Sequence, residues 1–130
     1  MKVAVSTTGK DLHCQIDPRF GRCSYFVLVD PESMEFEALE NEGLMASGGA
    51  GVQAAQLIAQ KGAKALITGN LGPNAASALS ASGIKVYLAP GGTVNDVITS
   101  YKSGSLREAS GASVPSHFGN SPAPPSTSKG

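Results

Sequence analysis

The chain has 130 residues, enough for one domain with a hydrophobic core but not for two. Ten basic and ten acidic residues cancel, and charged residues make up only 15% of the chain. This balance favours neither nucleic acid nor an anionic membrane as a partner, and no run of about 18 apolar residues predicts a membrane span.

The first predicted elements are a strand and a hairpin. Residues 2–6 (KVAVS) form a short β-rich run that ends in a turn, and it is typical of a buried strand rather than a secretion signal. A long polar loop over 7–23 follows. Residues 25–30 and 34–40 predict two further strands, and the turn at Pro31 joins them into a hairpin.

The rest of the chain predicts helices that alternate with strands. Each of the three helices is entered through a glycine-rich connection, and Thr93 is a candidate N-cap for the last one. The predicted elements are helices over 52–60, 73–81 and 94–101 and strands over 65–68 and 84–88.

This order of elements predicts one α/β domain over residues 1–109. Helical crossovers place the first, fourth and fifth strands parallel, while the hairpin adds antiparallel pairing. We therefore expect a mixed five-stranded sheet covered by helices on both faces. Residues 110–130 are rich in Ser, Pro, Gly and Ala, a composition that predicts a disordered tail.

Four connections are expected to meet at one edge of this sheet, at the carboxyl ends of its parallel strands. They are residues 7–23, 42–51, 69–73 and 89–93, and three of them are rich in glycine and lead into helix N-termini. Open α/β sheets commonly bind ligands at this edge, and helix N-termini favour anions. Each glycine could instead serve only a turn or a cap.

The first of these connections carries side chains suited to a soft metal or an anion. Cys14 and Cys23 are candidate metal ligands, although two thiols alone complete neither a four-cysteine cluster nor a zinc site. Either could instead be an inert thiol, Cys23 more readily because it lies just before a strand. Arg19 and Arg22 could hold an anion or form a salt bridge to Asp17. The candidate cofactor-binding residues are His13, Cys14, Arg19, Phe20, Arg22, Cys23, Gly48, Gly49, Gly69, Asn70, Leu71, Gly72, Gly91 and Gly92.

Catalysis is not indicated by any motif. The chain has no GxSxG, P-loop or HExxH, and its first strand has no carboxylate. Asp11, His13 and Asp17 are the only titratable groups at the predicted edge that suit acid–base chemistry, so we expect no enzyme. Two cysteines without a secretion signal favour a reducing compartment, and we expect the protein in the cytoplasm.

Four segments resemble the dinitrogenase iron–molybdenum cofactor biosynthesis family. They are residues 16–23 (IDPRFGRC), 48–55 (GGAGVQAA), 68–75 (TGNLGPNA) and 83–87 (GIKVY), and the resemblance spans about residues 1–107. It implies a ribonuclease-H-like three-layer α/β/α fold without nuclease residues. It also implies binding or carriage of a preassembled molybdenum-containing metal–sulfur cluster, of the iron–molybdenum or molybdenum–copper sulfide type.

The resemblance and the predicted edge agree, because such clusters are soft anions that suit arginines and helix N-termini. We therefore expect a monomeric, non-catalytic cluster carrier that holds its ligand non-covalently and has a client or regulatory protein as a further partner. A protein-interaction or regulatory module without metal is the main alternative. A hydrolase acting on an anionic substrate is another.

Overall fold

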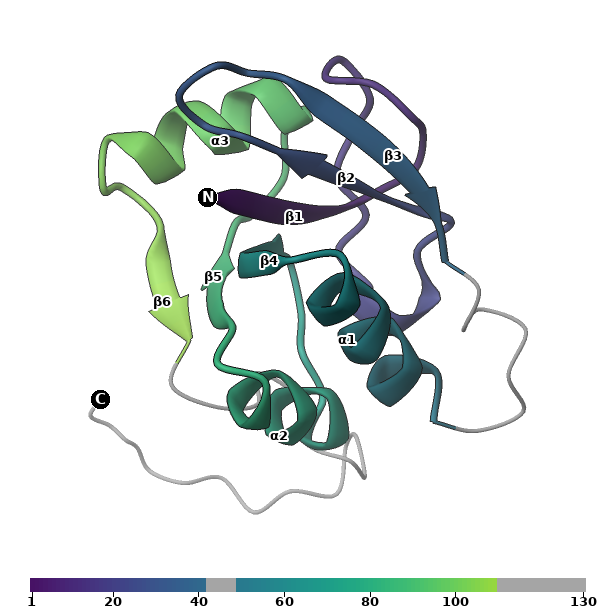
Figure 1. Cartoon of the computed structure of the whole chain (residues 1–130). Coiled ribbons are helices and arrows are strands. Elements are labelled where there is room, and N and C mark those ends of the chain that lie inside the picture. The colour runs from purple at the N-terminus through teal and green to yellow at the C-terminus, as the bar shows by residue number, and fades with distance from the viewer. Residues whose placement is uncertain (42–48, 110–130) are drawn as a thin grey trace.

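The computed structural model describes residues 1–41 and 49–109 (Figure 1). These residues form one sheet with helices packed on both of its faces. The helices are α1 (Ala50–Gln60), α2 (Pro73–Ala81), α3 (Val94–Lys102) and the short 3-10 helix η1 (Phe20–Arg22). The strands are β1 (Lys2–Thr7), β2 (Tyr25–Val29), β3 (Phe36–Glu40), β4 (Ala63–Thr68), β5 (Lys85–Leu88) and β6 (Arg107–Ala109).

The sheet is mixed, as the alternation of elements predicts. Its strand order is β3-β2-β1-β4-β5-β6. The strands β1, β4 and β5 run parallel to one another, whereas β2 is antiparallel to both β1 and β3. The predicted hairpin and the predicted parallel core are therefore confirmed.

The predicted count of five strands is wrong, because Arg107–Ala109 adds a sixth. This strand pairs antiparallel with β5 and closes the sheet at that edge. It is only three residues long and two of them are charged, so it lacks the apolar run that marks a strand in a sequence. It is held by its pairing with β5 rather than by its own β propensity.

Alternating side chains of the sheet pack into two separate hydrophobic cores, one on each face. On β1, Ala4 faces the core under α1 and α2, while Val3 and Val5 face the core under α3. Figure 1 shows α1 and α2 side by side, with α3 across the sheet from them. The three-layer arrangement is thus present, and the ribonuclease-H-like label stays a prediction.

The long connection after β1 is fixed to the strand ends by buried hydrogen bonds. The backbone N–H of Asp17 donates to the carbonyl of Ser6 at 2.8 Å, and the Ser6 hydroxyl lies 2.6 Å from the carbonyl of Asp17. The same hydroxyl lies 2.8 Å from Oγ1 of Thr68, at the end of β4. These bonds hold the second half of the connection, including η1, over the carboxyl ends of the parallel strands.

None of the described helices is both long and apolar enough to cross a membrane. The predicted tail over 110–130 lies outside the described residues, and so does Gly48.

Candidate functional site

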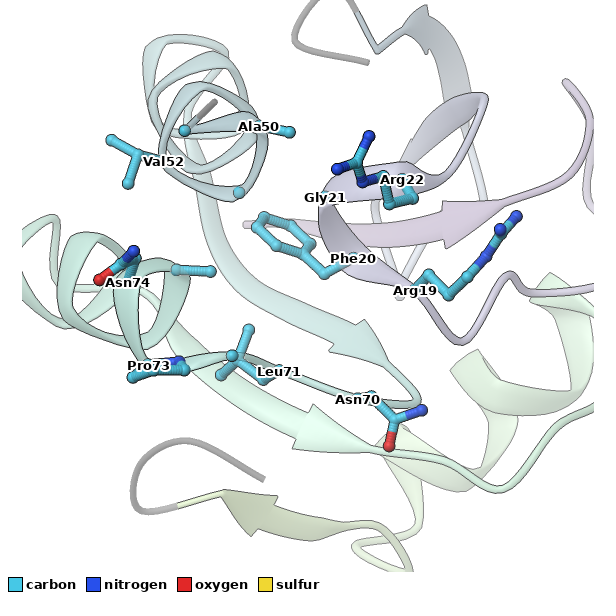
Figure 2. Close-up of a pocket in the computed structure, with 14 residues that line it drawn as sticks. Arg19, Phe20, Gly21, Arg22, Ala50, Val52, Asn70, Leu71, Pro73 and Asn74 are labelled. Atoms are coloured by element: carbon cyan, nitrogen blue, oxygen red, sulfur yellow. The ribbon is translucent and has the colours of Figure 1, made fainter. Parts of the chain in front are cut away.

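A pocket lies at the carboxyl edge of the sheet, on the face covered by α1 and α2. It has a volume of about 530 Å³ and is bounded by η1, by the connection after β4 and by the first turns of both helices (Figure 2). The residues that line it are Arg19, Phe20, Gly21, Arg22, Gly49, Ala50, Gly51, Val52, Asn70, Leu71, Gly72, Pro73, Asn74 and Ala75.

Glycines allow these segments to approach closely enough to form the pocket. A Cβ on Gly21 would lie 2.9 Å from the backbone nitrogen of Gly51, and a Cβ on Gly51 would lie 3.0 Å from the Cβ of Ala75. A Cβ on Gly69 would lie 2.6 Å from that of Pro18. A side chain at Gly21 or Gly51 would therefore push η1, α1 and α2 apart, and one at Gly69 would push the connection after β4 away from Pro18.

Both helices that open into the pocket lack a side-chain cap. The N-cap of α1 is Gly49, which has a left-handed backbone with φ of 72°, and the N-cap of α2 is Gly72. Within the described part of the chain, the backbone N–H groups of the first turns of these helices have no acceptor. The residues that carry them are Ala50, Gly51 and Val52 in α1 and Asn74 and Ala75 in α2.

The N-terminus of α3 is closed instead. Thr93 and Asp96 form a capping box, in which each side chain accepts from the other's backbone N–H at 3.1 Å. The next two N–H groups, of Val94 and Asn95, donate to carbonyls of the connection after β1. Because the first turn of α3 is satisfied by the chain itself, an anion has no free donors there.

Two arginines lie at the pocket, and their electrostatic situations differ. Arg22 is exposed and has no carboxylate partner among the described residues. The guanidinium of Arg19 donates through Nε and Nη2 to the two oxygens of Asp17, each at 3.1 Å. Burial raises the pKa of the Asp17 carboxyl, but hydrogen bonds from Arg19 and its charge outweigh burial and leave that pKa below its usual value.

The two predicted metal ligands lie against opposite faces of the sheet. Cys23 is fully buried beside Phe20, whose carbonyl accepts from its Sγ at 3.1 Å, and burial raises the pKa of this thiol to about 12. Cys14 packs against the core under α3, and its Sγ donates to the carbonyl of Asp11 at 2.9 Å. The two thiols therefore lie against different cores, one on each face of the sheet, and the prediction that they are metal ligands stays a prediction.

About half of the predicted site residues line the pocket. Those that do so are Arg19, Phe20, Arg22, Gly49, Asn70, Leu71 and Gly72. Gly69 packs against Pro18 beside the pocket, and Cys23 lies beneath it in the core.

The other predicted residues gather elsewhere on the same edge of the sheet. The carbonyl of Cys14 accepts from the backbone N–H of Val94, the first of α3, and the carbonyl of Gly92 accepts from that of Ile16. His13 and Gly91 are exposed neighbours of these residues. This second group lies at the closed N-terminus of α3, away from the pocket, so the predicted single site divides between two faces.

The candidate site residues named from the sequence did not include the first-turn residues of α1 and α2. The helix predicted over 52–60 begins two residues earlier, at Ala50, because the low helix propensity of Gly51 conceals its start in the sequence. Gly51, Val52, Asn74 and Ala75 line the pocket through these turns. The usable signal was the glycine before each helix, since a glycine N-cap leaves first-turn N–H groups without a side-chain acceptor.

The pocket offers hydrogen-bond donors and positive charge but no metal ligand and no acid–base pair. Its described lining contains no Cys, His, Asp or Glu. Across the described residues, no three such side chains come together in a way that could hold a metal ion. Helix N-termini at the carboxyl ends of parallel strands are a common place for an anion in α/β domains, and the described lining has the chemistry that suits one.

The chain belongs to the dinitrogenase iron-molybdenum cofactor family, whose model matches residues 1–104. Its motifs also resemble the orange protein of sulfate-reducing bacteria. In agreement with this, the fold is similar to that of the apo form of the orange protein from Desulfovibrio gigas. The TM-score is 0.82 and the sequences are 40% identical, over 85% of this chain and 94% of that one.

Two further relatives support this family membership. A putative NifB protein from Thermotoga has a similar structure, with a TM-score of 0.73 and 39% identity over 82% of this chain and 91% of that chain. A protein from Methanocaldococcus jannaschii described as uncharacterized is 35% identical over 97 residues, which are 72% of this chain and 82% of the relative.

Proposed function

We propose that this protein binds and carries a preassembled, molybdenum-containing metal–sulfur cluster, held non-covalently in the pocket between η1, α1 and α2. The cluster is the cargo and keeps its own sulfide ligands. Both the iron–molybdenum and the molybdenum–copper sulfide types are anionic and suit such a pocket. The proposed role is non-catalytic, exercised by a monomer in the cytoplasm that passes its cargo to a client protein.

The observation that carries this proposal is the contrast among the three helices. The N-terminus of α3 is closed by a capping box, whereas α1 and α2 begin at glycines beside one shared pocket, and their first-turn N–H groups have no acceptor among residues 1–41 and 49–109. Helix N-termini attract negative charge, and two of them at one pocket reinforce each other. Arg22 adds a full positive charge at the rim of the same pocket.

The chemistry of the lining fits an intact sulfide cluster better than a bare metal ion. Backbone N–H groups and a guanidinium donate hydrogen bonds to anionic ligands and do not coordinate metals. The single thiol near the pocket, Cys23, is buried and stays protonated at neutral pH because burial raises its pKa to about 12. Family membership supports the same class of ligand, as does the likeness to the orange protein.

The test is reconstitution of the metal-free protein. Tetrathiomolybdate and Cu(I) are added, small molecules are removed by gel filtration, and the visible absorption of the protein fraction is recorded. We expect a coloured species that co-elutes with the protein. A colourless protein fraction would contradict the proposal and would favour a metal-free interaction module.

A pair of charge variants tests where the cargo binds. Arg22→Gln should weaken binding by roughly tenfold, because a hydrogen bond from a charged donor contributes on the order of 1.5 kcal/mol. Lys61→Gln removes the same charge at the far end of α1 and should leave affinity unchanged. Equal effects of the two substitutions would mean that only net charge matters and that the pocket is not the site.

A further inference from the structure

The carboxylate of Asp17 does not line the pocket, but it is bound to Arg19, which does. The other features of this pocket favour an anion. The side chain of Asp17 is only 6% exposed, whereas that of its partner Arg19 is 66% exposed. Asp17 accepts from Arg19 at three points: Oδ1 accepts from the backbone N–H at 3.0 Å and from Nε at 3.1 Å, and Oδ2 accepts from Nη2 at 3.1 Å. The pair is therefore a bidentate salt bridge in which the Asp17 carboxylate is buried and the Arg19 guanidinium is exposed.

The backbone of Asp17 is held in place independently of the Arg19 side chain. The backbone of Asp17 is hydrogen-bonded in both directions to Ser6 at the end of β1. The main chain of Asp17 therefore stays at the end of β1 if the Arg19 side chain turns toward a ligand. Figure 2 shows the Arg19 guanidinium directed away from the first turns of α1 and α2, although the residue itself lines the pocket.

We propose that Asp17 is a positioning residue that holds the guanidinium of Arg19 away from the helix N-termini and so withholds its charge from the bound anion. This role for Asp17 rests on the proposed function, because it requires that the cargo is anionic. Arg22 and the two helix N-termini then supply the attraction, and Asp17 keeps affinity below what two free arginines would give. Moderate affinity suits a carrier, which must release what it binds.

A merely structural role for the pair predicts the opposite result. If the salt bridge served only to hold the connection over the strand ends, its loss would loosen the pocket and weaken binding. If Asp17 withholds charge, its neutralisation strengthens binding. The sign of the change in affinity therefore separates the two roles.

The experiment compares the wild type with Asp17→Asn, using tetrathiomolybdate alone as the probe. Binding is followed through the amide resonances of Gly51 and Asn74 in ¹H–¹⁵N spectra. We expect the variant to bind roughly threefold to tenfold more tightly, because one screened unit charge acts over several ångströms. The affinity of the variant should also fall more steeply with added salt.

Asp30→Asn is the matched control for charge. Asp30 lies at the end of β2 remote from the pocket, where its carboxylate accepts from the backbone N–H of Glu32. This control should bind like the wild type. Unchanged or weaker binding by Asp17→Asn, or equal tightening in both variants, would overturn the proposal.

A measurement on the wild type keeps the proposal testable even if the variant folds poorly. The Nε–H resonance of Arg19 should stay at its position when the pocket is saturated, because the guanidinium remains on Asp17. A large shift of that resonance would mean that Arg19 turns to the ligand, and the proposal would fail. If the wild-type amides do not respond to the probe at all, the proposed function fails instead, so the two failures are distinguishable.

Discussion

Gly72 occupies the N-cap of α2 although its backbone does not require a glycine. Its φ of −82° suits any residue, and a Cβ there would meet nothing within 4 Å. Gly49 at the start of α1 is different, because its φ of 72° favours glycine. At Gly72 the missing side chain is best explained by what it leaves open, namely the N–H groups of Asn74 and Ala75.

Gly72→Asp should therefore separate stability from binding. An aspartate cap would accept from a first-turn N–H and would leave the free energy of unfolding unchanged or higher by a few tenths of a kcal/mol. The same carboxylate would occupy the donors and repel an anion, so cluster binding should be lost. Urea denaturation and reconstitution measure the two effects, and a variant that still binds would count against the role of α2.

Cys23 makes stability depend on pH in the alkaline range. Burial raises the pKa of its thiol from 9.0 to about 12, so above pH 9 the unfolded chain loses a proton that the folded chain keeps. The folded state then binds more protons than the unfolded state, and stability falls as pH rises from about 9 toward 12. The contribution is fully present only below pH 9.

We expect this effect as a loss of about 1.4 kcal/mol per pH unit in the free energy of unfolding. Urea denaturation of the wild type and of Cys23→Ala between pH 8 and 11 measures it, since the variant lacks the titrating group. The difference in stability between the two proteins should shrink over this range. A constant difference would mean that the thiol is not the source.

At the scale of elements, η1 and α1 meet through glycine backbone. Gly21 lies so close to Gly51 that a Cβ would come within 3.0 Å of both its nitrogen and its Cα. This contact places Phe20 in the core beneath the pocket and Arg22 at the rim. The short helix therefore depends on α1 for its position.

Gly21→Ala should separate η1 from α1. Overpacking of this kind costs about 1–3 kcal/mol, and the displaced rim should also weaken cluster binding. Gly72→Ser is the control for stability, because it adds a side chain where the structure leaves open space. Thermal unfolding measures the stability of both variants. Equal stability would mean that a Cβ at Gly21 can be accommodated beside Gly51.

Elements with strong local signals were predicted well, and those defined by pairing were not. The parallel strands and α3 with its Thr93 cap follow from apolar runs and capping residues. The strand Arg107–Ala109 exists only through its partner β5, and Met34, predicted to begin a strand, instead adopts a positive φ of 63° before Phe36. Local patterns carry no information about such long-range pairing.

At the scale of the whole molecule, the sheet divides the edge at the carboxyl ends of its parallel strands into two halves. One half lies beside α1 and α2 and holds the pocket, and the other lies beside the capped N-terminus of α3. The connection after β1 lies over α3 in its first part and over α1 in its second, with the change at Ile16 and Asp17. The predicted connections over 7–23, 69–73 and 89–93 do meet at this edge, but the predicted site merges residues from both halves. Which face a residue in an irregular connection joins cannot be predicted from its sequence pattern, because such segments lack periodicity.

A binding map would distinguish the two halves. On addition of the cluster, the amides of Gly21, Gly51 and Asn74 should shift or broaden, since their segments line the pocket. The amides of His13 and Thr93 should stay unchanged, because they lie at the closed N-terminus of α3. Perturbation centred on α3 would overturn the assignment of the pocket.

The open first turns of α1 and α2 have one more consequence. An amide proton without an acceptor exchanges with deuterium of the solvent at close to its intrinsic rate, and one that is hydrogen-bonded exchanges more slowly. An occupant of the pocket would protect Ala50–Val52 and Asn74–Ala75 while the protons already bonded at the start of α3 stayed as they were. Deuterium uptake at these amides, measured by mass spectrometry, would therefore report whether the pocket is occupied, even for a cargo without visible absorption.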